Sequence, residues 1–274
     1  IRSRMATEEC GKRTRDGEGA AAQGVIERPK KGMYRSRAHA NPLADPIFNY
    51  PTKPDAMDWT ELFSVPGAGT TKQVAFLDVG CGFGGLLVKL AETHPDKLCV
   101  GLEIREKVAQ YVEDRIVAMR SESPGSCHNA AVIRTNAMKC LPFYFRRAQL
   151  EKMFFCFPDP HFKAKNHRRR VINHHLLAEY AFFLREGGLL YTISDVEDLH
   201  KWMVAKCTEH PCFARVSDSE LEQDPVVKLV MNSSEEATKV ERNKGLKLLA
   251  VFRRVAAPAD SLPFPVWSQE GNQE

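Results

Sequence analysis

A glycine-rich turn follows the first long apolar run of the chain and could hold a nucleotide-like ligand. The run ends at Asp78-Val79, and Gly80-Cys81-Gly82-Phe83-Gly84-Gly85 then leads directly into a helical pattern. Glycines let the backbone turn sharply and approach a ligand closely. The spacing satisfies both G-x-G-x-G and G-x-G-x-x-G, so taken alone it predicts either an S-adenosylmethionine site or a dinucleotide site.

One acidic side chain near this turn, Asp78, favours the S-adenosylmethionine site. Asp78 stands two residues before the turn, where a carboxylate would repel a pyrophosphate and attract the ammonium and sulfonium groups of S-adenosylmethionine. Glu103 ends the second apolar run, where it can accept the ribose hydroxyls of either nucleotide or stabilise the next helix. Asn136 follows the third run, where the adenine edge would lie. A dinucleotide-dependent oxidoreductase remains the alternative.

A third carboxylate follows the fourth apolar run. Asp159 lies between Pro158 and Pro160, whose rings fix the backbone and hold the acid rigidly. Five cations without an intervening acid come next, namely Lys163, Lys165, Arg168, Arg169 and Arg170. A basic segment of this kind indicates that a polyanion such as RNA binds beside the reacting carboxylate. A non-catalytic RNA-binding scaffold would share these cations, but it would have no reason to keep all three carboxylates.

Apolar runs that alternate with helical patterns position these residues. Continuous hydrophobic strands between helices are typical of a parallel sheet covered on both faces, whose ligands bind beyond the carboxyl ends of the strands. The predicted strands are 74–79, 98–102, 131–134, 153–157, 189–193 and 248–252. The predicted helices are 84–93, 105–120, 171–185, 195–209 and 232–245, with a short helical anchor at 58–63.

Composition and charge restrict the class of protein. The chain has 274 residues, of which 43% are hydrophobic and 27% charged, so wholesale disorder is excluded. Residues 1–40 carry ten Lys and Arg against five Asp and Glu, which makes the basic excess a property of the N-terminal tail.

The cysteines indicate neither a disulfide framework nor a metal site. The eight cysteines form no C-x-x-C pair and favour a reducing compartment. Cys207, His210 and Cys212 lack the further ligand that a structural zinc site needs, so we expect no metal.

Taken together, these motifs resemble the tRNA (guanine-N7)-methyltransferases, in the form of the eukaryotic catalytic subunit. The resemblance covers roughly residues 34–254, and the segment around Asp159 is its most specific part. Its blocks are Asp78-Val79-Gly80-Cys81-Gly82-Phe83-Gly84-Gly85-Leu86-Leu87, Gly101-Leu102-Glu103-Ile104-Arg105, Phe157-Pro158-Asp159-Pro160-His161-Phe162-Lys163 and Leu177-Ala178-Glu179-Tyr180-Ala181. The resemblance implies an α/β fold, the Rossmann-like class I methyltransferase fold, with a seven-stranded, mostly parallel sheet and an antiparallel last strand.

The resemblance also implies an activity and a set of site residues. The expected reaction transfers a methyl group from S-adenosylmethionine to N7 of a guanine in the tRNA variable loop, with Asp159 as the catalytic residue. A Thr-x-Glu of the family corresponds here to Ser234-Glu235-Glu236. The implied cofactor-binding residues are Gly80, Glu103, Ile104, Arg105, Asn136, Ala137, Cys156, Ser234 and Glu236.

Partners, location and domains follow from the same resemblance. Such subunits work with a WD-repeat β-propeller partner and are largely nuclear. We expect a disordered basic tail over residues 1–33, an extension that packs on the core over 34–72, the methyltransferase domain over 73–254 and a flexible tail over 255–274.

Overall fold

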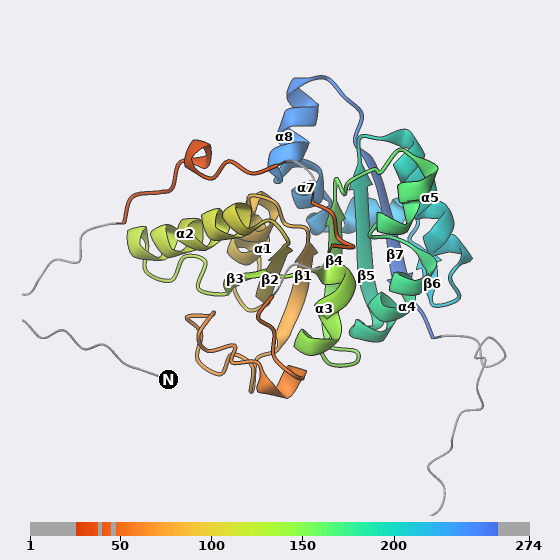
Figure 1. The fold of residues 1–274 in the computed structure, drawn as a ribbon. Helices are drawn as coiled ribbons and strands as arrows, with labels where there is room; N and C mark the ends of the chain where they lie inside the picture. Colours follow the sequence, from red (N-terminus) through yellow and green to blue (C-terminus); the bar gives the residue numbers. More distant parts are fainter. Residues whose placement is uncertain (1–25, 38–39, 45–47, 257–274) are drawn as a thin grey trace, which may run out of the picture.

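The computed structural model describes residues 26–37, 40–44 and 48–256, so most of the expected basic tail and of the expected C-terminal tail lies outside the described residues. In this part of the chain seven strands form one sheet, in the order β3-β2-β1-β4-β5-β7-β6 (Figure 1). β7 is antiparallel to both of its neighbours, and the other strands share one direction. The predicted mostly parallel sheet with an antiparallel last strand is therefore confirmed.

The strands follow the apolar runs, because a strand covered on both faces needs a hydrophobic side chain at nearly every position. All six residues of β1 and all six of β2 are buried. The strands are β1 Val74–Val79, β2 Leu98–Glu103, β3 Ala130–Arg134, β4 Leu150–Cys156, β5 Leu184–Ser194, β6 Phe213–Arg215 and β7 Leu248–Arg254. The six predicted strands are confirmed, and β6, which has only three residues, was not predicted.

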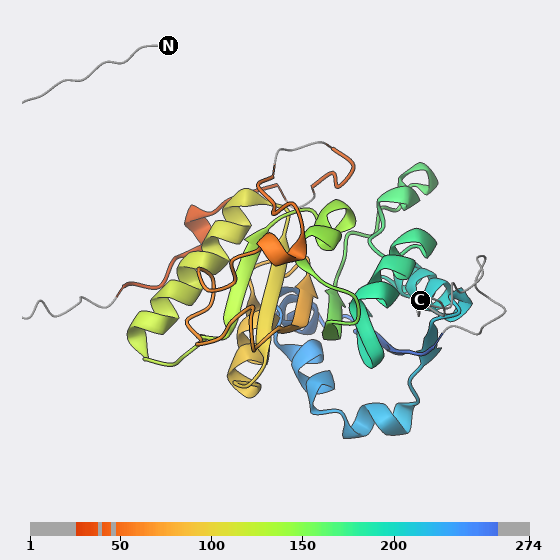
Figure 2. The ribbon, with the colours of Figure 1, turned by 90° about the horizontal axis from the view of Figure 1, so that it is seen from below.

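Helices cover both faces of the sheet and create two hydrophobic cores. One core lies under α3, α4 and α5 together with the N-terminal extension, and the other lies under α1, α2 and α7. Figure 2 shows α7 on the opposite side of the sheet from residues 48–72 of the extension. The helices are α1 Gly85–Thr93, α2 Glu106–Glu122, α3 Ala137–Tyr144, α4 His174–Phe183, α5 Glu197–Glu209, α6 Asp218–Gln223, α7 Pro225–Asn232 and α8 Glu235–Arg242.

The N-terminal extension packs on the sheet through aromatic side chains. Trp59 and Phe63 are each 4% exposed, and the Trp59 ring stacks on that of Phe145. The prediction of a helix at 58–63 is wrong, because the Asp58 carboxylate accepts hydrogen bonds from the amide and hydroxyl of Thr60 and holds the chain in turns. The anchoring role remains, but turns perform it.

A second N-terminal segment crosses the outside of α2 toward α8 (Figure 1). Arg28 forms an ion pair with Glu122 at the end of α2, and Lys31 forms one with Glu235 in α8. Short 3₁₀ turns complete the described elements at Lys31–Met33, Pro54–Ala56 and Ala164–Arg169. Within the described residues, none of the helices combines the length and the apolarity that crossing a bilayer requires.

Candidate active site

A cavity opens where the carboxyl ends of β1, β2 and β4 meet, at the edge where ligands of parallel sheets bind. It brings together residues that lie up to 131 positions apart in the chain, from Ala40 to Val171. Among the predicted site residues it is lined by Gly80, Glu103, Ile104, Arg105, Asn136, Ala137, Cys156, Asp159 and Arg169. The Pro-rich segment before β1 also contributes Ala40 and Pro42, which the sequence patterns did not indicate.

The glycine turn leaves open space beside the cavity. Gly80 and Gly82 have φ angles of +74° and +55°, which residues with a Cβ adopt only with strain. A Cβ built on either glycine would meet no atom within 4 Å, so the backbone faces free volume there. The amides of Gly80 and Cys81 both donate to the Leu102 carbonyl, which fixes the turn to the end of β2. The turn can therefore accept a ligand against its backbone.

Asp78 lies beneath this turn as a buried carboxylate. It is 2% exposed, and its Oδ1 atom has no hydrogen-bond partner among the described residues. Burial, with smaller contributions from the carboxylates of Glu235 and Glu103, raises the pKa of Asp78 to about 8. A cationic ligand above the turn would supply the positive charge that this carboxyl group lacks.

Glu103 is held in place by the residue that precedes α2. Its Oε1 atom accepts hydrogen bonds from the amide and Nε of Arg105, and its Oε2 atom accepts one from Nη2 at 2.9 Å. The hydrogen bonds that its guanidinium donates to Glu103 raise the pKa of Arg105. Carboxylate oxygens retain further lone pairs, so the pre-oriented Glu103 can still accept from a pair of hydroxyl groups in the cavity.

Asn136 is placed at the cavity, but its side chain already has two protein partners. Its Oδ1 accepts from the Met138 amide and caps α3, while its Nδ2 donates to the Pro42 carbonyl at 2.7 Å. The side chain thus ties the segment at 40–44 to the cavity wall.

Cys156, at the end of β4, also lines the cavity. Burial raises the pKa of its thiol well above the usual value, so Cys156 presents a neutral group to a ligand.

Asp159 stands in a strained turn at the mouth of the cavity. Phe157 and His161, two residues on either side of it, have φ angles of +50° and +44°, unusual for residues other than glycine. The amide of Phe157 donates to the Ile193 carbonyl at 2.8 Å, which ties the start of the turn to β5. The charge of Asp159 also raises the pKa of Arg105, so the carboxylate lies near the Glu103–Arg105 pair.

Arg170 braces the other end of this turn instead of facing solvent. It is 5% exposed, and its Nε donates to the Pro160 carbonyl at 2.9 Å. Its guanidinium lies 4.7 Å from the ring centre of Trp202 on α5, whose indole donates to the Ile172 carbonyl. We predicted Arg170 as an RNA contact, but the structure places it inside the protein, where packing against Trp202 compensates part of the burial of its charge.

The other predicted RNA contacts remain at or near the surface. Lys163, Lys165 and Arg168 are exposed around the 3₁₀ turn after Asp159. Arg169 is half-buried and lines the cavity, and its Nε has no hydrogen-bond partner within the described chain. These four cations form one basic surface beside the Asp159 turn, and their role as RNA contacts stays a prediction.

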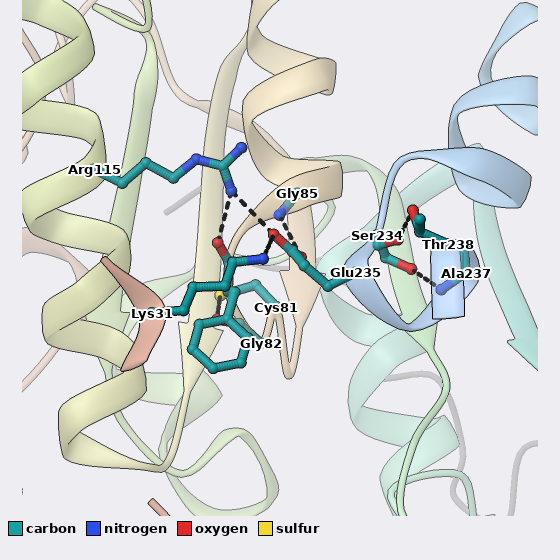
Figure 3. A network of polar contacts seen from close by, with 10 residues as sticks. Lys31, Cys81, Gly82, Gly85, Arg115, Ser234, Glu235, Ala237 and Thr238 are labelled. Carbon is teal, nitrogen blue, oxygen red and sulfur yellow. Dashed lines mark hydrogen bonds and ion pairs between the residues drawn. The ribbon is translucent and has the colours of Figure 1, made fainter. Parts of the chain in front are cut away.

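The C-terminal contact with the glycine turn comes from Glu235, the middle residue of the predicted Ser-Glu-Glu. Its Oε2 accepts from the Gly85 amide at 3.1 Å, and its Oε1 lies 3.1 Å from both Arg115 and Lys31 (Figure 3). This carboxylate caps the N-terminus of α1 and joins the turn to α2 and to the N-terminal segment.

Ser234 and Glu236 are not brought to the cavity. The hydroxyl of Ser234 accepts from the Ala237 amide and caps α8, while Glu236 forms an exposed ion pair with Lys239 (Figure 3 shows the Ser234 cap). Their contact with a cofactor stays a prediction, and the structure indicates Glu235 as the residue of this segment that reaches the glycine turn.

Comparisons with known proteins decide between the alternatives left by the glycine turn. A family model described as "Putative methyltransferase" matches residues 72–249. Proteins named tRNA (guanine-N(7)-)-methyltransferase are 53% identical in Drosophila virilis and 55% identical in Brugia malayi. The matches cover 86% and 85% of this chain, and 95% and 89% of those proteins. The chain belongs to the tRNA (guanine-N7)-methyltransferase family.

Family membership settles the nature of the cofactor and leaves the oxidoreductase and scaffold alternatives unsupported. S-adenosylmethionine is the cofactor, and the cavity fits it. Open space lies at the glycine turn, and the nearby carboxylate of Asp78 is buried with no hydrogen-bond partner for its Oδ1 atom among the described residues. Solved methyltransferase structures share the fold of the chain at low sequence identity. The aminoglycoside resistance methyltransferase NpmB1 matches 68% of this chain and 89% of its own at 17% identity and a TM-score of 0.43. A likeness at this level does not bear on function.

Proposed function

We propose that this protein transfers the methyl group of S-adenosylmethionine to N7 of a guanine in the variable loop of tRNA. The observation that carries the proposal is the position of Asp159, which lies on the wall of the cofactor cavity within a chain whose curated relatives are named for this reaction. A guanine held against Asp159 would lie next to the reactive end of the cofactor.

The chemistry of guanine defines what the protein has to supply. N7 carries an in-plane lone pair and no proton at neutral pH, so methyl transfer needs no general base to activate the nucleophile. Asp159 instead accepts hydrogen bonds from the guanine N1–H and exocyclic amine, which fixes the base for in-line attack. The negative charge of the carboxylate also offsets the positive charge that develops on the ring. Adenine would present the wrong donors to this carboxylate.

The protein side of the cavity divides into binding and positioning roles. Glu103 would hold the ribose of the cofactor, and the backbone of the glycine turn would lie along its amino-acid end above Asp78. The basic surface of Lys163, Lys165, Arg168 and Arg169 would bind the tRNA backbone near the target, because Lys and Arg neutralise phosphates.

Nucleoside analysis tests the proposal directly. The full chain is incubated with labelled S-adenosylmethionine and total tRNA, with and without a propeller subunit, and the digested tRNA is separated into nucleosides. The proposal predicts a single labelled product, N7-methylguanosine. A label on another base or on another atom of guanine, or no label even when the propeller subunit is present, would refute it.

Two further expectations belong to the same proposal. We infer that the enzyme works as a heterodimer with a WD-repeat β-propeller subunit, which co-purification and a gain of activity on mixing would support.

We also infer that the enzyme is nuclear, because the basic clusters at 12–15 and 28–31 are suited to nuclear import. Deletion of residues 1–31 should shift a fluorescent fusion toward the cytoplasm.

A further inference from the structure

A second hollow opens beside the cofactor cavity and continues outward from Asp159. The two share Ala40, Asp159, His161 and Arg169 on their walls. The second is completed by Asn41, Pro160 and Phe162. The catalytic carboxylate thus stands at the junction of the two hollows, one able to hold the cofactor and one leading away from it.

Phe162 forms the outer wall of this hollow and is unusually exposed for an aromatic residue. It is 72% exposed, whereas Phe76, Phe154 and Phe155, which precede the same edge of the sheet, are at most 2% exposed. A single exposed apolar side chain is common on protein surfaces. Phe162 differs because it lines a hollow that shares Asp159 and Arg169 with the cofactor cavity.

The charges around Phe162 indicate what the surface binds. Lys163, Lys165 and Arg168 are exposed in the following turn, and the Nε of Arg169 is buried at the wall of the hollow with no acceptor among the described residues. A flat ring beside several cations is the arrangement by which proteins hold unpaired nucleotides, with the base on the ring and the phosphate on the cations.

We propose that Phe162 is a stacking platform for the unpaired base of a nucleotide adjacent to the target guanine, and that Arg169 binds the phosphate between them. This inference rests on the proposed function and extends it to a second nucleotide site. The target guanine itself occupies the junction at Asp159, so the ring three residues further out is available to its neighbour. The stacked neighbour would hold the strand open while the target is unstacked from the RNA.

A protein partner is the weaker interpretation of this surface. The residues that follow Phe162 in the chain are cations, and the hollow leads directly to the catalytic carboxylate. An interface with a folded protein would instead be centred on a set of apolar side chains, with charged residues depleted from its core.

Kinetics with altered tRNA test the proposal. The rate constant kcat/KM for N7 methylation is measured with intact tRNA and with tRNA carrying an abasic nucleotide immediately 5′ or 3′ of the target guanine. Phe162→Ala should lower kcat/KM about 5- to 100-fold, since stacking on an aromatic ring contributes that much per base. An abasic nucleotide on one side of the target should cause a similar loss in the wild type and no further loss in Phe162→Ala. Phe162→Trp should retain the wild-type rate.

Phe182→Ala provides the matched control, because Phe182 is 51% exposed on α4 away from both hollows, and this variant should keep wild-type kinetics. The proposal is overturned if Phe162→Ala is as active as the wild type, or if neither abasic tRNA reproduces its loss. It is also overturned if an excess of the propeller subunit restores the kcat/KM of Phe162→Ala, because Phe162 would then contact that subunit and not the RNA. Failure of the wild type to methylate N7 of intact tRNA would instead refute the proposed function.

Discussion

The two turns that meet at the cavity are built in opposite ways. The turn after β1 uses glycines at its positive-φ positions, so its shape costs little strain and its backbone is open to a ligand. The turn after β4 places Phe157 and His161 in similar conformations, and each carries a side chain. Strain of this kind costs about 1–3 kcal/mol per residue and persists only where surrounding contacts enforce it.

This difference indicates which substitutions should disturb each turn. The glycine turn takes its shape from its own glycines, and the Leu102 carbonyl and the Glu235 carboxylate fix it to β2 and α8. The Asp159 turn depends on distant supports, namely the Ile193 carbonyl in β5 and the Arg170–Trp202 pair that joins Pro160 to α5. Changes at the first turn should therefore act on cofactor binding, and changes at the second should act on the rate of methyl transfer.

The largest effect should follow from removing the carboxylate of the second turn. Asp159→Ala should lower kcat about 30- to 1000-fold, which corresponds to about 2–4 kcal/mol of transition-state stabilisation. Single-turnover methylation of tRNA measures the rate, and isothermal titration with S-adenosylhomocysteine measures cofactor affinity. The affinity for S-adenosylhomocysteine should stay within about twofold of the wild type, because the substitution leaves the glycine turn intact. An equal collapse of both quantities would assign Asp159 to the cofactor site.

The pH dependence of stability tests the first turn. The pKa of Asp78 is raised to about 8 in the folded protein, mainly by burial, so between its ordinary pKa and pH 8 the folded state binds a proton that the unfolded state releases. The stability of the cofactor-free protein should therefore fall as pH rises, by about 2 kcal/mol between pH 6 and pH 8, and level off above that. Urea unfolding at several pH values measures this fall.

Asp78→Asn supplies the control for that measurement, because it keeps the shape of the side chain and removes the titration. The variant should lose this part of the pH dependence and should bind S-adenosylmethionine more weakly. If wild type and variant lose stability in parallel from pH 6 to pH 8, another group is responsible for the fall.

Loosening the brace on the second turn should have a moderate effect. Arg170→Lys keeps the charge but loses the Nε–H that donates to the Pro160 carbonyl, so kcat should fall about tenfold. The affinity for S-adenosylhomocysteine and the salt dependence of tRNA binding should not change, because Arg170 is buried. A shallower salt dependence in this variant would show that Arg170 contacts phosphate after all.

The smallest effect should come from the exposed cations. The triple variant Lys163→Ala, Lys165→Ala, Arg168→Ala should weaken tRNA binding about three- to tenfold. The slope of log affinity against log salt should decrease by about two, since each neutralised phosphate contributes roughly 0.7–0.9. Filter binding at several salt concentrations measures both values. Unchanged affinity and slope would place the tRNA on another face of the protein.

Local sequence patterns were sufficient to predict the location of a residue when that location depends only on the residue's own strand. Glu103 ends an apolar run, and Gly80 and Asp159 follow closely after two others. Parallel strands bring their carboxyl ends to one edge, so these three could be predicted to share a cavity. The strands themselves were predictable for the same reason, apart from β6, which is too short to form a recognisable run.

Residues whose positions depend on other elements could not be predicted in this way. Arg170 is indistinguishable in sequence from its basic neighbours, and its burial follows from Trp202, which lies 32 residues later. Glu235 reaches the glycine turn because the start of α8 orients it and not Ser234 or Glu236. Ala40 and Pro42 line the cavity from an extended segment without a periodic pattern.

A tRNA with inosine in place of the target guanosine tests most directly whether Asp159 holds the guanine by its N1–H and amine edge. Inosine keeps N7 and N1–H but lacks the exocyclic amine. We predict that the wild type methylates the inosine tRNA about tenfold more slowly than normal tRNA, because one hydrogen bond to a charged group is lost. Asp159→Ala should methylate both tRNAs at the same reduced rate. An inosine penalty of equal size in wild type and Asp159→Ala would contradict this account.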